Sequence, residues 1–164
     1  MKFKTFIGID IAKSTFDLVA FNPDQKPLHR HLTNDMSGIG RLVKMIYKTE
    51  VEPSQVLICM EHTGVYIELL VKTLQREGYF VWVVPPIIIK QNSVGMQRLK
   101  SDKADAKKIA RFASNYQEEA REYKADSPLI ERIKNLFRLR KQLVSQRQRS
   151  FNFASTNKDK AKPD

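Results

Sequence analysis

A change of hydrophobic period near residue 34 constrains the fold of this 164-residue sequence more than any other feature. Before it, apolar and polar residues follow strand-like patterns over residues 3–9, 15–21 and 28–33. After it, apolar residues recur at helical spacing from Ile39 to Tyr47, with Asn34 or Asp35 as the expected N-cap. The sequence therefore predicts three antiparallel strands followed by an amphipathic helix.

Strands and helices alternate in the next part of the chain. Further strands are expected at 56–60 and 80–84, and further helices at 63–76 and 101–114. Gly78 should stop the first of these helices, and Pro85-Pro86 should break the chain after the last strand. The later strands are expected to run parallel to the first. This order is typical of an α/β, RNase H-like mixed five-stranded sheet with flanking helices.

The charge balance favours a polyanionic partner. Lys and Arg number 29 against 18 Asp and Glu, which gives a net charge of +11 and favours nucleic acid, although a basic protein without a specific anionic partner remains an alternative. The single cysteine, Cys59, lies in an apolar run and is expected in a buried strand rather than a disulfide. No apolar segment is long enough for a membrane span, so we expect a cytoplasmic protein without a membrane partner.

Four acidic residues stand where predicted elements begin or end. Asp10 and Glu61 follow strands that can be parallel neighbours, which would place their backbones roughly 5 Å apart. Asp102 and Asp105 open the helix at 101–114, where about 100° per residue puts both on or beside its apolar stripe, with Lys103, Lys107, Lys108 and Arg111 on the other side. The plainer alternative is two strand-end acids and two acids favoured by a helix N-terminus.

Clustering such acids has an electrostatic cost. Two carboxylates at about 4 Å repel by roughly 4 kcal/mol at an effective dielectric of 20, so a cluster requires a cation or a shared proton. Carboxylate oxygens are hard ligands that favour Mg²⁺ or Mn²⁺. The four acids together therefore predict a divalent metal site.

Three segments carry a family resemblance. Residues 8–13 (GIDIAK), 61–66 (EHTGVY) and 100–106 (KSDKADA) resemble the DEDD transposases of the insertion-sequence-110 family and the related Piv-type DNA invertases. The resemblance implies a RuvC-like catalytic domain in which two Mg²⁺ or Mn²⁺ ions are held by Asp10, Glu61, Asp102 and Asp105. It also implies DNA strand cleavage and exchange in transposition, with a structured guide RNA as a further partner.

The resemblance also sets a domain organisation. We expect an RNase H-like domain at 1–125, a basic helix at 126–155 and a polar tail at 156–164. Full-length family members continue into a second domain with a catalytic serine, which this sequence does not contain, so recombination is expected to need more than this chain. Neither Ser14 nor Ser101 is expected to be that nucleophile.

The basic helix should extend from Ser127 to about Phe153, with an apolar stripe and a strongly basic surface. This combination suits nucleic-acid binding or a coiled-coil contact that makes a homo-oligomer; a helix docked within its own chain is the alternative. The residues expected to contact nucleic acid are Lys13, Lys100, Lys103, Arg138, Lys141 and Arg147.

Other residues near the acids have ordinary explanations. His62 is expected to make local hydrogen bonds rather than to orient a water or touch a phosphate. Tyr66, Phe80 and Trp82 are expected in the core rather than in base stacking.

Two other functions remain open. Gly8-Ile9-Asp10 could be the first phosphate loop of an actin-like sugar kinase, but that loop needs a glycine shortly after the aspartate, and 164 residues are too few for two kinase lobes. The chain could also be a non-catalytic nucleic-acid-binding or assembly module that keeps the acids as features of the fold. Binding of Mn²⁺, of ATP or of neither distinguishes the three.

Overall fold

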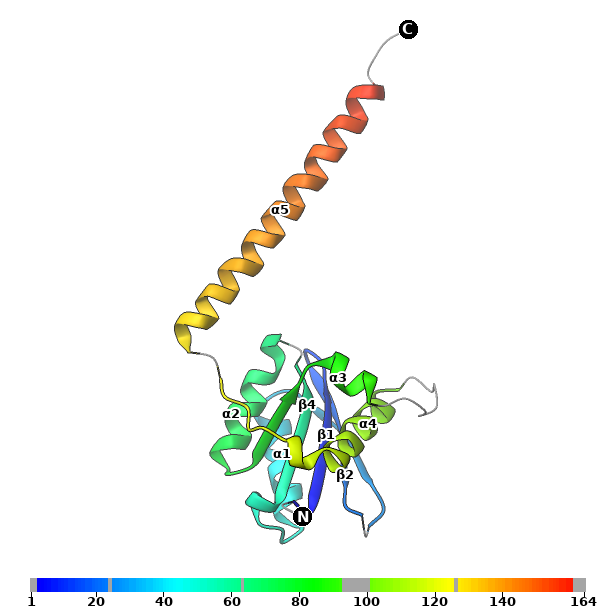
Figure 1. Cartoon of the computed structure of the whole chain (residues 1–164), viewed down its shortest axis with the longest axis vertical. Coiled ribbons are helices and arrows are strands. Elements are labelled where there is room, and N and C mark those ends of the chain that lie inside the picture. The colour runs from blue at the N-terminus through cyan, green and yellow to red at the C-terminus, as the bar shows by residue number, and fades with distance from the viewer. Residues whose placement is uncertain (1–2, 24, 63, 93–100, 126, 161–164) are drawn as a thin grey trace. The chain divides into compact units, whose positions relative to one another are not determined.

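The computed structural model describes residues 3–160 except 24, 63, 93–100 and 126 (Figure 1). The chain divides into two compact units, Met1–Tyr123 and Lys124–Asp164, which are described separately here. The first unit contains a sheet with helices on both faces, and the second contains one long helix.

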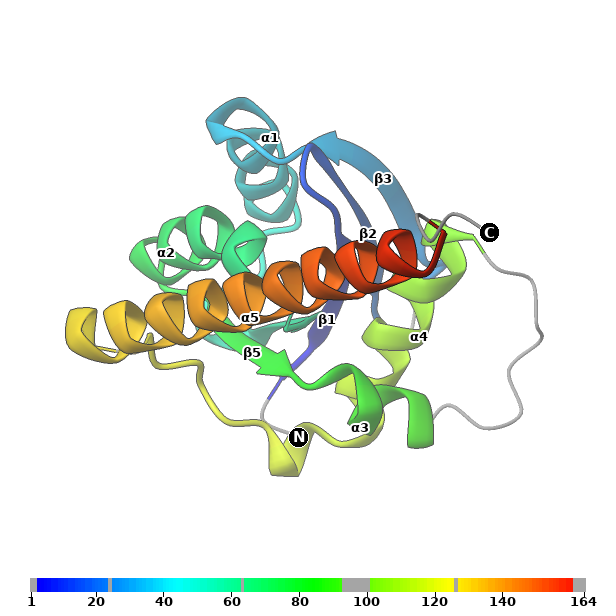
Figure 2. The same cartoon turned by 90° about the horizontal axis from the view of Figure 1, so that it is seen from above.

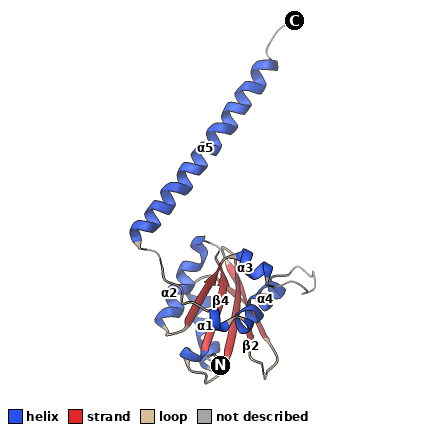
Figure 3. Ribbon diagram, in the orientation of Figure 1, coloured by secondary structure: helices blue, strands red, loops and turns tan. Residues whose placement is uncertain are grey.

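The first unit is built on a mixed sheet, drawn in red in Figure 3. Its five strands lie in the order β3-β2-β1-β4-β5. Its strands β1 and β2 pair antiparallel, as do β2 and β3, whereas β4 and β5 run parallel to β1. The predicted mixed sheet is therefore confirmed. The strands are β1 Thr5–Ile11, β2 Thr15–Phe21, β3 Leu28–Thr33, β4 Val56–Glu61 and β5 Phe80–Val84.

Strand β1 begins and ends later than the sequence pattern predicted, at Thr5–Ile11 instead of residues 3–9 with Asp10 as the end. Asp10 and Ile11 continue the antiparallel ladder by pairing with Asp17 and Phe16 of β2, so the strand ends one residue after Asp10. An acidic residue inside a strand interrupts the hydrophobic pattern without interrupting the backbone pairing, which explains the difference.

Helices α1 (Met36–Tyr47) and α2 (Glu68–Arg76) cover one face of the sheet (Figure 2). Of the two residues expected as the N-cap of α1, Asp35 caps the helix: its side chain accepts a hydrogen bond of 2.8 Å from the Gly38 backbone N–H. Tyr47 was expected on the apolar stripe of α1 but is 82% exposed. Tyr47 is the last residue of α1 and lies beyond the end of the core. Periodicity predicts which side of a helix faces the core, but it does not predict how far along the helix the core extends.

Two elements near α2 differ from the prediction. The chain after β4 first forms a 3₁₀ turn at Gly64–Ile67, because Gly64 has a φ of 77°, outside helical geometry. After β5, where two prolines predicted only a break, a short helix α3 (Pro86–Gln91) begins. Proline suits the first turn of a helix, since its fixed φ is helical and its missing N–H would have no partner there.

Helix α4 (Asp102–Asn115) packs on the opposite face of the sheet, as Figure 2 shows. Its contact with β1 is so close that a Cβ on Gly8 would lie 2.2 Å from both the Ala106 carbonyl oxygen and the Ala110 backbone nitrogen. Cys59 and Trp82 are buried in the same core layer, as predicted. Tyr66, which was also expected in the core, is 40% exposed, because it lies in the 3₁₀ turn rather than on a core-facing helix.

The second unit is the helix α5 (Pro128–Lys160), which runs seven residues beyond the predicted end. The predicted cap is present, since the Ser127 hydroxyl oxygen accepts from the Ile130 backbone N–H at 3.3 Å. Large apolar side chains are exposed along it: Leu129, Ile130, Ile133, Leu136, Phe137, Leu139, Leu143, Val144, Phe151 and Phe153. Within the described residues, no helix has the length and apolar character needed to cross a bilayer.

Candidate active site

Asp10 and Glu61 are neighbours at the carboxyl end of two parallel strands. The register of β1 and β4 pairs Ile9 with Met60, so the next residue on each strand is an acid. Both acids are partly buried. The sheet continues past Glu61, since the His62 backbone N–H donates to the Val84 carbonyl at 3.0 Å, and the His62 side chain is exposed.

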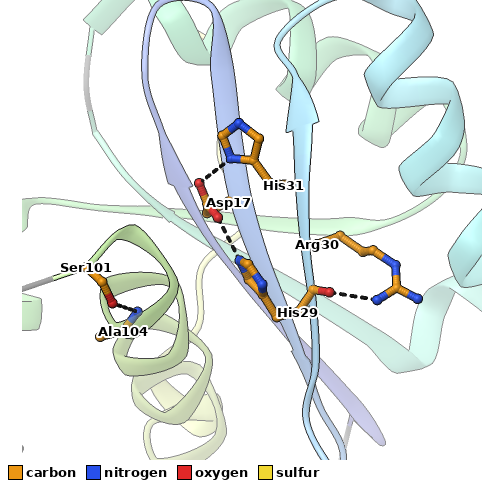
Figure 4. A network of polar contacts seen from close by, with 6 residues as sticks. All are labelled: Asp17, His29, Arg30, His31, Ser101 and Ala104. Carbon is orange, nitrogen blue, oxygen red and sulfur yellow. Dashed lines mark hydrogen bonds and ion pairs between the residues drawn. The ribbon is translucent and has the colours of Figure 1, made fainter.

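The first turn of α4 carries the other two predicted acids. Ser101 caps the helix, and its hydroxyl oxygen accepts from the Ala104 backbone N–H at 3.2 Å (Figure 4). Asp105 has a side chain that is 37% exposed, and Asp102 is also exposed. The close packing of Gly8 against Ala106 holds this turn over β1, two residues before Asp10.

Electrostatic coupling shows that the acids occupy one region. Burial raises the pKa of Asp10, and the charges of Asp105, Asp102 and Asp17 raise it further, against a backbone hydrogen bond from Ile11. Burial likewise raises the pKa of Glu61, followed by the charges of Asp10 and Asp105, while Lys108 acts in the opposite direction. The structure therefore brings Asp105 within electrostatic reach of both Asp10 and Glu61, and Asp102 within reach of Asp10.

Lys108 has a different place from the one predicted. It was expected on the solvent side of α4 together with Lys103, Lys107 and Arg111, but its Nζ donates to Asp105 Oδ1 at 2.7 Å. The two residues are three apart on one helix, and the long lysine stem can fold back over that distance. One oxygen of Asp105 is therefore already bonded.

The remaining predicted contact residues are dispersed. Lys13 is exposed in the turn between β1 and β2, and Lys103 is exposed in the first turn of α4. Lys100 lies outside the described residues. The other three are exposed on α5, in the second unit: Arg138, Lys141 and Arg147.

The donor set suits a divalent cation, although the side chains are not arranged around one point. Carboxylates that are partly desolvated and repel one another are stabilised by a hard cation. Within the described part of the chain, however, no three acid, histidine or cysteine side chains stand close enough to form a ligand group. Coordination by both oxygens of Asp105 would also require Lys108 to leave Oδ1. The residues fit such an ion by their chemistry, and binding needs side-chain rotation.

The Asn34 side chain forms hydrogen bonds to the loops after β1 and β4, which the sequence did not predict. Its Nδ2 donates to the carbonyl oxygen of Ala12 at 3.2 Å and to that of Tyr66 at 3.0 Å. Ala12 follows β1 and Tyr66 lies in the turn after β4. The side chain thus bridges the loops that follow Asp10 and Glu61.

A second polar group next to Asp10 was also missed. Asp17 of β2 is buried and hydrogen-bonded to His29 and His31 of β3 (Figure 4). Two signals could have found it: an acid in an otherwise apolar strand segment, and a His-x-His spacing that puts both histidines on one face of a strand.

The fold resembles that of a solved structure. A solved structure of RuvC from Thermus thermophilus superposes with a TM-score of 0.52, covering 73% of this chain and 99% of that one, at 14% sequence identity. At that identity the likeness concerns the fold alone, and it confirms the predicted RuvC-like architecture.

Two curated proteins are similar in sequence. The pilin gene-inverting protein of Moraxella bovis is 32% identical over 152 residues and that of Moraxella lacunata is 31% identical over 150, in both cases across 89% of this chain. The chain spans 46% of the length of each. The model of the DEDD transposase family of the insertion-sequence-110 type, described as "Transposase", matches residues 7–155. The chain belongs to this DEDD transposase family.

Proposed function

We propose that this chain is the metal-dependent catalytic domain of a DNA transposase or site-specific recombinase, and that it cleaves and exchanges DNA strands. One observation carries the proposal: Asp10 and Glu61 are adjacent on parallel strands, burial raises the pKa of both, and the charge of Asp105 on a third element raises both further. Partly buried acids that repel one another stabilise a fold poorly, so their juxtaposition is better explained by a bound cation.

The proposed ligands are Asp10, Glu61, Asp102 and Asp105, and the proposed cofactor is two Mg²⁺ or Mn²⁺ ions. Such ions, when bound, supply an activated oxygen nucleophile and stabilise the leaving oxygen in phosphoryl transfer. Asp10 is paired with Asp17 of β2 and directly follows the Ile9–Met60 pair with β4, so the sheet holds its backbone in place. Asp102 and Asp105 adjust by side-chain rotation, and Lys108 moves from Asp105 to a phosphate or to solvent.

Three further partners belong to this proposal. DNA is the substrate. Its proposed phosphate contacts are three lysines close in sequence to the proposed ligands and three residues of α5: Lys13, Lys100, Lys103, Arg138, Lys141 and Arg147. A structured guide RNA is a partner of the full-length protein. A second copy of the chain packs against α5, whose exposed Ile130, Ile133, Phe137, Val144 and Phe151 follow a heptad-like spacing.

Metal binding is the direct test. Calorimetric titration of the chain with Mn²⁺ should give saturable binding that Asp10→Asn weakens at least tenfold. Glu68→Gln removes an equally charged, exposed acid from α2 and should leave the binding unchanged. In the full-length transposase, Asp10→Asn and Asp105→Asn should abolish strand cleavage while the thermal melt stays cooperative. Wild-type Mn²⁺ affinity in Asp10→Asn would overturn the metal site and leave a nucleic-acid-binding module as the function.

A further inference from the structure

Asp17 and its two histidine partners form a built polar group beside the proposed catalytic acids. The Asp17 side chain is only 9% exposed, and each of its oxygens accepts one short bond. His29 Nε2 lies 2.6 Å from Oδ1, and His31 Nδ1 lies 2.7 Å from Oδ2 (Figure 4). A buried carboxylate held from both sides fixes the orientation of both rings. We call Asp17, His29 and His31 the Asp17 cluster.

The strand register aligns this cluster with Asp10. Asp10 is directly opposite Asp17 in the β1–β2 ladder, and Asp17 is directly opposite His31 in the β2–β3 ladder. Residues directly opposite each other project from the same face of a sheet, with Cβ atoms about 5 Å apart. A row of polar side chains therefore leads from the carboxylates to β3, which is the edge strand.

This row lies on the face that α4 covers. Val19, two residues after Asp17 on β2, packs against Ala106 and Ala110 of α4. Side chains two apart on a strand share a face, so the Asp17 cluster flanks the helix that carries Asp102 and Asp105. The two histidines are the part of the Asp17 cluster that solvent reaches, since the side chain of His29 is 29% exposed and that of His31 is 57% exposed.

The chemistry of the cluster suits an anion rather than a metal. Both carboxylate oxygens are already bonded, and the two rings converge on that carboxylate instead of on a common empty point. Each ring keeps one nitrogen that does not bond Asp17, namely His29 Nδ1 and His31 Nε2.

These outer nitrogens can serve as donors to phosphate. An imidazolium placed between a carboxylate and a phosphate satisfies both of its N–H groups, so phosphate binding favours the doubly protonated ring. Together with Lys13 and Lys103, these N–H donors would offset the negative charge of an otherwise acidic centre.

We propose that His29 and His31, oriented by Asp17, bind a backbone phosphate of the DNA strand that reaches the Asp10 and Glu61 carboxylates. The inference rests on the proposed function for the identity of that strand. The histidines act in binding and Asp17 is a positioning residue, because it reaches the phosphate only through the two rings.

The test measures DNA binding without metal, so it does not depend on catalysis. The affinity of the full chain for a single-stranded DNA of about 20 bases is measured by fluorescence anisotropy in EDTA across a range of salt concentrations. The double variant His29→Gln/His31→Gln should lose about tenfold in affinity, and the slope of log K against log[salt] should fall by roughly 1. Asp17→Asn should give a smaller loss, since its amide can accept from only one ring.

Arg30→Gln is the matched control. Arg30 lies between the two histidines on β3 but projects from the opposite face, and its Nη1 donates to the His29 carbonyl at 2.8 Å. This variant removes a full positive charge from the same strand and should change the affinity less than twofold. Equal losses in the double histidine variant and in Arg30→Gln would overturn the phosphate site, as would a loss seen only with an RNA of the same sequence.

Folding and the proposed function are checked separately. His31→Gln alone changes a largely exposed side chain and should keep the wild-type melting temperature while showing part of the affinity loss. Mn²⁺ titration of the double histidine variant should still report binding at the four acids. If the wild-type chain does not bind Mn²⁺, the proposed metal site is wrong. If a folded His31→Gln variant binds DNA with wild-type affinity, the Asp17 cluster is not a phosphate site.

Discussion

Gly8 of β1 and Ala106 of α4 pack backbone against backbone, since a Cβ on Gly8 would lie 2.2 Å from the Ala106 carbonyl oxygen. This contact determines where the first turn of α4, with its two aspartates, meets the strand that carries Asp10. No side-chain movement can relieve a clash with a backbone carbonyl. The position of the acidic group therefore depends on the absence of a side chain at residue 8.

Gly8→Ala should lower the free energy of unfolding by about 3 kcal/mol or more, because the helix must move away from the sheet. Gly40→Ala is the control, since a Cβ there meets nothing within 4 Å and the residue lies inside α1. In a helix, that exchange should stabilise by roughly 0.5–1 kcal/mol. Urea unfolding monitored by circular dichroism measures both, and a Gly8→Ala protein as stable as wild type would contradict the close packing.

The metal-free domain should gain stability when Asp10 loses its charge. The folded-state pKa of Asp10 is raised above 3.8, chiefly by burial and then by the charge of Asp105. A raised pKa gives stability that is present below pH 3.8 and is lost as the pH rises through the folded value. Asp10→Asn should therefore raise the melting temperature by a few degrees at pH 7 in EDTA, and the difference should shrink toward pH 4.

Asp35 provides a control, because its pKa is shifted in the opposite direction from that of Asp10. Its pKa is lowered, chiefly by the hydrogen bond from the Gly38 backbone and then by that from the Thr33 hydroxyl. A lowered pKa contributes stability above the ordinary value that is lost as the pH falls through the folded one. Asp35→Ala should therefore reduce the melting temperature at pH 7. A lower melting temperature for Asp10→Asn as well would mean that the clustered carboxylates do not repel one another in the absence of metal.

Lys108 should compete with a metal ion for Asp105. Its Nζ occupies Asp105 Oδ1 at 2.7 Å, and its charge opposes the rise in the pKa of Glu61. Lys108→Met frees that oxygen and makes the site more negative, so Mn²⁺ affinity measured by calorimetry should increase about threefold to tenfold. Lys107→Met removes the same charge from the preceding position of α4 and should have a smaller effect on Mn²⁺ affinity. Weaker Mn²⁺ binding in Lys108→Met would show that the lysine organises the site instead of competing for it.

The sequence predicted the parts of the fold that depend on local pattern. Strands β2, β3 and β5 have the predicted bounds, and the parallel course of β4 beside β1 follows from their helical crossover. Helix α3 was missed because Pro85-Pro86 was taken as a break, although proline is compatible with a first helical turn.

The site was predictable only in part, because distances across the fold are not encoded in spacing along the chain. The adjacency of Asp10 and Glu61 followed from parallel pairing. The ion pair of Lys108 with Asp105 depends on a side-chain rotamer, which the helical wheel does not determine. The bonds from His29 and His31 to Asp17 depend on the β2–β3 register, which the sequence did not fix.

Helix α5 should account for much of the salt dependence of nucleic-acid binding. It holds nine Lys or Arg against two acidic residues, and its described side chains are all exposed. Each lost phosphate contact lowers the slope of log K against log[salt] by about 0.9, so the triple change Arg138→Gln, Lys141→Gln and Arg147→Gln should lower it by roughly 3.

The control is a second triple variant that removes the same net charge from the first unit. It changes a lysine in α1, the lysine directly after α1 and a lysine in α2 to glutamine: Lys44, Lys48 and Lys72. These lysines are on the face away from α4, and their loss should lower the slope by less than about 1. Equal slopes for the two triple variants would mean that α5 attracts nucleic acid only through net charge, and its basic residues would then not be phosphate contacts.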